Sequence, residues 1–225
     1  MTHTYVITGC NRGVGLELAR QLSARGERVV ATARDVDAAE ELRALDVDVH
    51  PLDVADPASV ERFAAAVSAR PIDVLINNAG VGVRSKPFEQ VDFDEMQGFF
   101  AVNTLGAMRV TRALLPGLRA GKGKKIVNMT SRMGSIGDNG SGGAYAYRAS
   151  KAALNMVTRS LAIDLLDEGF VCIVLHPGWV RTDMGGRRAP TPPEESAGGM
   201  IRVIDGLRRQ DSGEFFDYKG ERVPW

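Results

Sequence analysis

The strongest constraint on the fold is a regular alternation, along the whole chain, of apolar runs rich in Val and Ile with segments of helical periodicity. Most of the apolar runs lack polar alternation, which predicts strands covered on both faces. They comprise residues 5–8, 29–32, 47–52, 74–77, 126–130 and 171–176, with a short seventh run at 214–216. Because short connections link strands and helices in turn, we expect right-handed crossovers and a parallel sheet.

Four segments between these runs predict helices, at residues 14–25, 57–68, 93–118 and 149–168. Pro57 after Asp56 predicts a helix start, Pro116 is expected to close the third helix, and Gly169 the fourth. No repeat or linker divides the 225 residues. We therefore expect one α/β domain over residues 1–225, a doubly wound Rossmann fold with a mainly parallel seven-stranded sheet flanked by helices. A Pro-, Gly- and Arg-rich stretch after the sixth strand predicts a short substrate lid over about residues 184–196.

Composition argues against several classes of function. The 28 basic and 28 acidic residues give a formal net charge of zero, which disfavours broad binding to nucleic acid or anionic lipid. No apolar run has membrane-spanning length, and residues 1–7 enter a strand without an export signal, so we expect a cytoplasmic protein. Cys10 and Cys172 fall in or beside predicted buried strands and are expected to be free. The three histidines lack metal-ligand spacing, so a zinc-dependent dehydrogenase is a poor fit.

Three glycines, Gly9, Gly13 and Gly15, follow the first predicted strand and open the first predicted helix. Their spacing differs from the common G-x-G-x-x-G fingerprint, but the physical requirement is the same. Glycine lets the chain turn sharply and lets main-chain N–H groups approach a pyrophosphate at a helix N-terminus. A tight turn alone would also use glycine, yet the position at the first strand–helix junction favours dinucleotide binding.

Charge at the end of the second predicted strand bears on the choice of cofactor. NAD enzymes place an acidic residue there, whereas this strand ends in small residues followed by Arg34. Arg12 lies within the glycine turn, and two guanidinium groups suit a phosphate. We therefore favour NADPH over NADH. Two alternatives stay open, since both arginines suit a solvated surface and Asp35 suits a ribose hydroxyl if the register differs by one or two residues.

Tyr147 and Lys151 lie four residues apart, which places the phenol and the ammonium on one face of a helix. A nearby cation favours the phenolate and is expected to lower the tyrosine pKa from its reference of about 10. A tyrosine tuned in this way can transfer a proton near neutral pH. Tyr145 competes on paper, but Ala149 stands where its lysine partner should be.

Together these motifs resemble the short-chain dehydrogenase/reductase family, over nearly the whole chain. The resemblance also draws on segments 9–13, 177–184 and 213–225, which look most like those of the small carbonyl reductases of the sniffer and C-factor type. The five motifs, in the order the family has them, are the turn from Thr8 to Gly15, Asn77-Asn78-Ala79-Gly80, Asn103, Ser131, and Tyr147 with Lys151.

The resemblance implies catalytic roles for four residues. Tyr147 would give a proton to the substrate carbonyl oxygen, and Ser131 would hydrogen-bond the same oxygen. Lys151 would lower the tyrosine pKa and hold the nicotinamide ribose, while Asn103 would hold a water that links Lys151 to solvent. Ser131 precedes Tyr147 by slightly more than the commonest family spacing, so Ser135 is an alternative for the serine role and Thr130 a weaker one.

The resemblance also implies a cofactor site, a substrate class and an assembly. The substrate would be a small carbonyl compound, and the helices at 93–118 and 149–168 would pair copies into a homodimer or homotetramer. Two other functions stay open: an NAD-dependent alcohol dehydrogenase, and a nucleotide-binding regulatory or signalling protein with little turnover. The cofactor-binding residues expected are Gly9, Asn11, Arg12, Gly13, Val14, Gly15, Arg34, Asp53, Val54, Asn77, Ala79, Gly80, Tyr147, Lys151, Pro177, Gly178, Val180 and Thr182.

Overall fold

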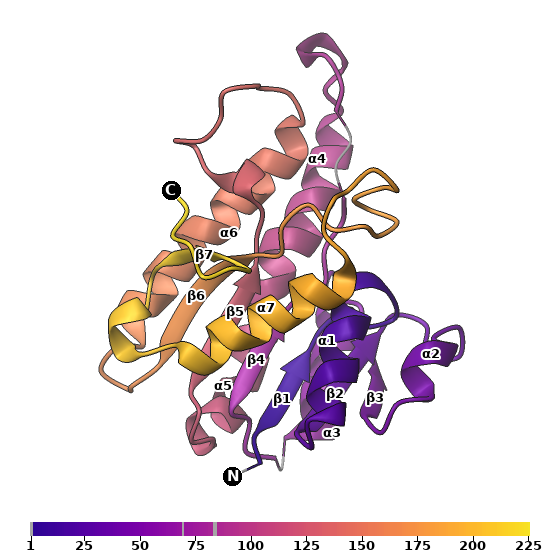
Figure 1. Cartoon of the computed structure of the whole chain (residues 1–225), viewed down its shortest axis with the longest axis vertical. Helices are drawn as coiled ribbons and strands as arrows, with labels where there is room; N and C mark the ends of the chain where they lie inside the picture. The colour runs from indigo at the N-terminus through magenta and orange to yellow at the C-terminus, as the bar shows by residue number, and fades with distance from the viewer. Residues whose placement is uncertain (1, 69, 83–84) are drawn as a thin grey trace.

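The computed structural model describes residues 2–68, 70–82 and 85–225. Seven strands form one sheet in the order β3-β2-β1-β4-β5-β6-β7, and every neighbouring pair is parallel (Figure 1). The sheet is therefore all parallel, where the sequence predicted a mainly parallel one. The strands are β1 Thr4–Ile7, β2 Arg28–Ala33, β3 Asp48–Pro51, β4 Val74–Asn77, β5 Lys125–Met129, β6 Val171–His176 and β7 Phe215–Asp217.

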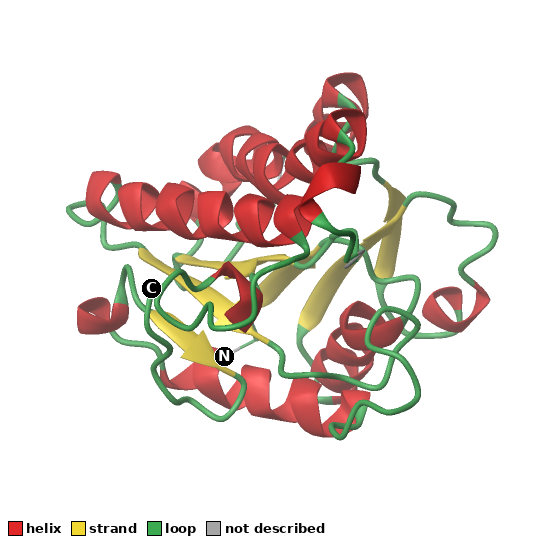
Figure 2. Cartoon of the chain, turned by 90° about the horizontal axis from the view of Figure 1, so that it is seen from above, coloured by secondary structure: helices red, strands yellow, loops and turns green. Residues whose placement is uncertain are grey.

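Helices cover both faces of the sheet, which confirms the predicted doubly wound α/β fold (Figure 2). On one face α1 and α7 pack together over a cluster that includes Ile7 and Ile173. On the other face a second cluster, including Val6 and Phe63, lies beneath α3, α5 and α6. The helices are α1 Gly13–Ala24, α2 Glu40–Arg43, α3 Pro57–Val67, α4 Phe93–Phe100, α5 Ala107–Ala120, α6 Tyr145–Asp164 and α7 Pro193–Gly206.

The helix predicted over residues 93–118 is wrong in its detail. Six residues, Ala101–Gly106, form a π-helical segment between α4 and α5. Pro116 does not close the helix, because α5 continues to Ala120. Proline removes one main-chain donor, and near a helix end that loss affects a single hydrogen bond. The π-helical segment has a functional consequence, since it contains Asn103.

Two further boundaries differ from the prediction. The helix expected at 149–168 begins four residues earlier, at Tyr145, and ends at Asp164. Helix α7 was not predicted at all, and its first turn occupies the end of the predicted lid. Gly198 and Gly199 lower the helix propensity of that segment. A Cβ at Gly199 would lie 2.3 Å from the main-chain oxygen of Tyr218, so glycine there serves the packing of α7 on the segment after β7.

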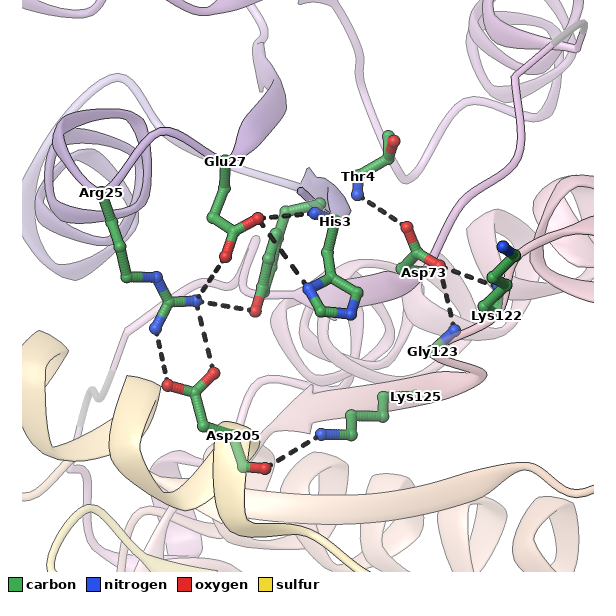
Figure 3. Close-up of polar contacts among 10 residues, drawn as sticks. His3, Thr4, Arg25, Glu27, Asp73, Lys122, Gly123, Lys125 and Asp205 are labelled. Carbon is green, nitrogen blue, oxygen red and sulfur yellow. Dashed lines mark hydrogen bonds and ion pairs between the residues drawn. The ribbon is translucent and has the colours of Figure 1, made fainter. Parts of the chain in front are cut away.

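A polar network lies at the amino-terminal ends of the strands, opposite the carboxyl ends where parallel sheets bind ligands (Figure 3). Arg25 pairs with Asp205 at 2.6 Å and with Glu27 at 3.2 Å. The Asp73 carboxylate accepts three main-chain hydrogen bonds, from Thr4, Lys122 and Gly123. None of the helices in the described part of the chain is long and apolar enough to cross a membrane.

Candidate active site

The glycine turn after β1 is closed too tightly to hold larger residues. Gly9 has a φ of 72°, and a Cβ there would lie 2.8 Å from the Cα of Ala79. A Cβ at Gly15 would lie 2.3 Å from the main-chain oxygen of Gly9. Real side-chain carbons do not approach that closely, so both positions need glycine. The expected turn is thus formed, with Gly13 at the first position of α1.

Asn78 holds this turn in place, a role that was not predicted from the sequence. Its Nδ2 donates to the main-chain oxygens of Thr8 and Gly9, both at 2.9 Å. The main-chain nitrogen of Ala79 donates to the Thr8 hydroxyl at 3.0 Å. The sequence signal for this role was the motif Asn77-Asn78-Ala79-Gly80, which starts at the last residue of β4, the strand next to β1. It fixes the turn from the next strand along the sheet.

The start of α1 fits an anionic cofactor. Among the described residues, no side chain caps this end of the helix, and the first turn carries no acidic residue. The first N–H groups of a helix need acceptors, and the helix dipole favours a negative charge there. A dinucleotide pyrophosphate satisfies both requirements, so the residues present suit the cofactor that the sequence predicted.

The two arginines expected at the cofactor 2′-phosphate have different surroundings. Arg12 pairs with Asp183, from the segment after β6, at 3.3 Å, and both side chains are largely exposed. Arg34 is exposed directly after β2. The Asp35 carboxylate, the alternative ligand for a ribose hydroxyl, accepts a hydrogen bond from the main-chain nitrogen of Ala38 at 3.1 Å. Asp35 thus serves a local turn with one carboxylate oxygen, beside the exposed guanidinium of Arg34.

Tyr147 and Ser131 meet in a buried site. Both are under a tenth exposed, and the Ser131 hydroxyl is a hydrogen-bond partner of the Tyr147 phenol. Ser131 comes from the end of β5 and Tyr147 from the first turn of α6. Ser131 also caps a short 3-10 turn, since its Oγ accepts from the main-chain nitrogen of Met133 at 3.1 Å. The two hydroxyls can therefore address one substrate oxygen.

The expected effect of Lys151 on the tyrosine is not what the structure gives. Burial raises the pKa of Tyr147, and only the hydrogen bond with Ser131 lowers it. Burial also lowers the pKa of Lys151 to about 8. The Lys151 ammonium donates to the main-chain oxygen of Met129 at 2.7 Å and lies 6.0 Å from the centre of the Tyr147 ring. In this geometry, burial therefore shifts the pKa values of Tyr147 and Lys151 more than the attraction between the two groups does.

Asn103, for which the sequence predicts a relay role, lies in the same corner of the structure as Lys151. Its Oδ1 accepts from the main-chain nitrogen of Val81 at 2.9 Å, and its Nδ2 donates to the Ser150 hydroxyl at 3.0 Å. A Cβ at Gly80 would lie 3.2 Å from the Asn103 Oδ1 and 3.6 Å from the Lys151 Nζ. Gly80 therefore keeps this corner open between the amide and the ammonium.

The alternatives for the serine and tyrosine roles are engaged elsewhere. The Ser135 hydroxyl accepts from the main-chain nitrogen of Asp138, and Thr130 donates to the Asn155 amide oxygen at 2.6 Å. Tyr145 is 40% exposed, and its ring packs on Phe88. Among the candidates for the serine and tyrosine roles, Ser131 and Tyr147 are the two that meet in one buried site.

Three expected cofactor residues have structural contacts at the strand ends. Asn77 donates to Thr111 of α5 and to Asn128 of β5, at 3.0 and 2.8 Å, and so joins the sheet to a helix that covers it. Asp53 is half-buried after β3, where its Oδ1 accepts from the main-chain nitrogen of Ala55. Val54 is buried, with its Cγ2 2.7 Å from where a Gly106 Cβ would lie.

The segment after β6 folds back on the glycine turn. A Cβ at Gly13 would lie 3.2 Å from the Thr182 methyl group, so this segment faces the start of α1. Pro177 accepts a hydrogen bond from Ser196 of α7, and Val180 bridges to Thr191. Residues 193–196 of the predicted lid belong to α7. These contacts hold the segment 177–192 at both ends. A surface pocket of about 400 Å³ on it is lined by Arg181, Thr182, Asp183, Gly186 and Arg187.

Known proteins share this architecture over the whole chain. A model of the short chain dehydrogenase family matches residues 3–192. The C-signal of Myxococcus xanthus is 56% identical over 163 residues, which cover 72% of this chain and 98% of that protein. The NADPH-bound carbonyl reductase from chicken fatty liver has a TM-score of 0.93 at 35% identity, covering 100% of this chain and 99% of that one. Carbonyl reductase Sniffer of D. melanogaster has a TM-score of 0.94 at 33% identity, with 100% of each chain covered.

Proposed function

Since the chain belongs to the short-chain dehydrogenase family, we propose that it reduces aldehyde and ketone carbonyls with NADPH, and oxidises alcohols in reverse. The observation that carries the proposal is the buried contact between Ser131 and Tyr147, with Lys151 one helical turn on. Two structural relatives described as carbonyl reductases, one of them NADPH-bound, support the substrate class and the cofactor.

The residues of the chain divide the chemistry between them. Bound NADPH supplies the hydride for the carbonyl carbon. Tyr147 donates its phenolic proton to the carbonyl oxygen, and the Ser131 hydroxyl stabilises the negative charge that develops there. Lys151, with a pKa of about 8, is mainly protonated at neutral pH and favours the tyrosinate that remains. Asn103, in the same corner as the Lys151 ammonium, would help to return a proton to Tyr147 and Lys151.

The charges at the end of β2 support NADPH as the cofactor. Arg34 presents an exposed guanidinium, which suits the additional phosphate of NADPH. Asp35 is engaged in a turn with Ala38 and is therefore a poor candidate for the ribose hydroxyls of NADH. Arg12 joins the phosphate site if it exchanges Asp183 for the phosphate; an exposed ion pair of this kind is worth little and is easily exchanged.

The test is a panel of aldehydes, ketones and quinones assayed for NADPH oxidation, with NADH in parallel. Tyr147→Phe removes the proton donor but keeps the ring, so we expect kcat to fall about 10²–10⁴-fold. Cofactor binding should persist, measured by the fluorescence of bound NADPH. A Tyr147→Phe variant with near wild-type turnover would contradict the assignment.

A role in signalling is a second candidate, because the 56% identical relative is a C-signal. The same panel separates the two functions. If the protein binds NADPH but oxidises it with no member of the panel, the nucleotide serves recognition rather than turnover. The buried contact of Ser131 with Tyr147, with Lys151 one helical turn on, favours an enzyme over a signalling protein.

We also propose that copies pair through the long helices, as the family resemblance implies. The outer side of the π-helical segment and of α5 exposes Leu105 and Met108, and α6 exposes Met156 and Ile163. Met156 and Ile163, both on α6, are 67% and 61% exposed. Neighbouring apolar side chains that are this exposed on a helix commonly mark an interface. A second copy would cover them.

A further inference from the structure

Residues 223–225, here called the strap, cross from β7 to the loop that carries Ser131 (Figure 1). The main-chain nitrogen of Val223 donates to Phe215 of β7 at 2.8 Å. At the other end, the main-chain nitrogen of Gly137 donates to the oxygen of Trp225, also at 2.8 Å. The strap therefore connects the edge of the sheet to the loop between β5 and α6.

The strap is anchored on the sheet through Val223 and through the Trp225 ring, while Pro224 and Trp225 stay partly open to solvent. Val223 is 4% exposed and forms a small cluster with Val174 and Phe215. The Trp225 ring lies 5.7 Å from that of Phe215, centre to centre. The turn that leads into the strap is fixed by Asp217, whose carboxylate accepts from the main-chain nitrogens of Lys219 and Glu221. A seated strap can restrain what it touches.

The loop that it touches has its other anchors on α6. Arg148 donates to the main-chain oxygen of Met133 at 3.3 Å, and Asn155 donates to that of Gly134 at 3.1 Å. Beyond Gly134 the chain emerges to the surface, and the Ile136 side chain is 79% exposed. Gly137 is where the strap holds the outer end of the loop.

We propose that the strap is a positioning element for the carbonyl half of the reaction. By holding Gly137 it fixes residues 131–137, and so keeps the Ser131 hydroxyl against that of Tyr147. This inference rests on the proposed function for its kinetic part. The glycine turn lies at β1, which is separated from β6 and β7 in the sheet by β4 and β5. The contacts of the strap described above are with Phe215 and Gly137, not with the expected cofactor residues at 177–182. The strap should therefore affect the carbonyl substrate and leave NADPH binding unchanged.

The experiment compares three variants in the full chain. Trp225→Ala removes the ring that packs on Phe215, and Trp225→Phe retains an aromatic ring. Glu221→Ala is the matched control, an exposed side chain in the adjoining turn. Hydrogen–deuterium exchange of peptides covering residues 131–140 reports the loop directly, and steady-state kinetics report kcat and both KM values.

For Trp225→Ala we expect at least tenfold faster exchange at residues 131–140 and a fall of about tenfold in kcat/KM for the carbonyl, because small misplacements of reacting groups are costly. The KM for NADPH should change less than twofold. Trp225→Phe should recover most of both effects, and Glu221→Ala should show neither. If Trp225→Ala does not fold, Gly137→Val disturbs the contact from the exposed side of the loop, where a Cβ would lie 3.2 Å from the Trp225 oxygen.

Each outcome decides the matter. Unchanged loop exchange in Trp225→Ala, or in Gly137→Val, overturns the strap even if the wild type is an active enzyme. Faster exchange with unchanged carbonyl kinetics overturns its positioning role. A wild type that oxidises no NADPH refutes the proposed function and with it the kinetic part, while the exchange data still decide whether the strap holds the loop.

Discussion

Replacing Asp73 tests how the amino-terminal edge of the sheet is held together. One carboxylate oxygen accepts from Thr4 at 2.8 Å, and the other from Lys122 and Gly123 at 2.8 and 2.9 Å. These bonds join β1 and β4 to the turn before β5 (Figure 3). Partial burial raises the pKa of Asp73, but the three main-chain donors outweigh it, and the net pKa is below the usual value.

The expected cost follows from the three hydrogen bonds. Each bond to a charged acceptor contributes roughly 1.5–3 kcal/mol when buried, and less at this half-exposed position. Asp73→Ala should therefore lower the free energy of unfolding by about 2–4 kcal/mol. In Asp73→Asn, the amide oxygen still accepts from Lys122 and Gly123, but the amide nitrogen faces the Thr4 donor. That variant should lose about 1–2 kcal/mol.

Urea unfolding at fixed protein concentration measures both variants, with Asp167→Asn as the control because its carboxylate is fully exposed. The pH dependence gives an independent check. Since the folded-state pKa is below the unfolded value, the contribution of Asp73 is present above a pH of about 4 and is lost as the pH falls through the folded pKa. The gap between wild type and Asp73→Asn should narrow there. Equal stability at pH 7 would refute the reasoning.

Three further predictions concern the site and its surface. Arg34→Asp should shift the ratio of kcat/KM values toward NADH, and an unchanged ratio would exclude Arg34 from cofactor choice. Met156→Asp places a charge on the exposed face of α6 and should convert an oligomer to monomers in light scattering; a native mass equal to one chain in the wild type would contradict pairing. Lys151→Met should abolish turnover yet raise the free energy of unfolding at pH 7 by about 1–3 kcal/mol, since burial lowers the Lys151 pKa to about 8. That penalty is fully present below a pH of about 8 and disappears as the pH rises toward the unfolded value of about 10.5, so a stability gain that persists above that range would count against it.

The elements that the sequence predicted well are those governed by local pattern. Most of the strands are rich in buried apolar residues, with β3 the exception, and the predicted limits agree with the structure to within a residue or two. The glycine turn was equally clear, because Gly9 and Gly15 occupy positions that no other residue fits. The family resemblance named Ser131 and Tyr147, and the structure brings these two side chains together in a buried site.

What the sequence could not predict depends on contacts made far away along the chain. The π-helical turn around Asn103 is fixed by Val81 and Ser150, which come from other segments. Helix α7 contains two adjacent glycines, so its helical state reflects packing against the segment after β7 rather than propensity. The Tyr147 pKa was misjudged because spacing shows the neighbouring cation but not the burial that opposes it.

Lys151 and Asp73 lie at opposite ends of the strands, the first in the proposed active site and the second in a network that stabilises the fold. A lysine that is 5% exposed, with a pKa lowered to about 8, costs folding free energy. In the function proposed above, this cost accompanies the role of its ammonium beside Tyr147. Stabilising interactions are found at the other end of the strands, where Asp73 accepts main-chain hydrogen bonds and Arg25 pairs with Asp205. This network lies at the amino-terminal ends of β4 and β5, whereas Gly80 and Ser131 follow their carboxyl ends. Loosening the network should therefore lower the unfolding temperature well before it alters the KM for NADPH.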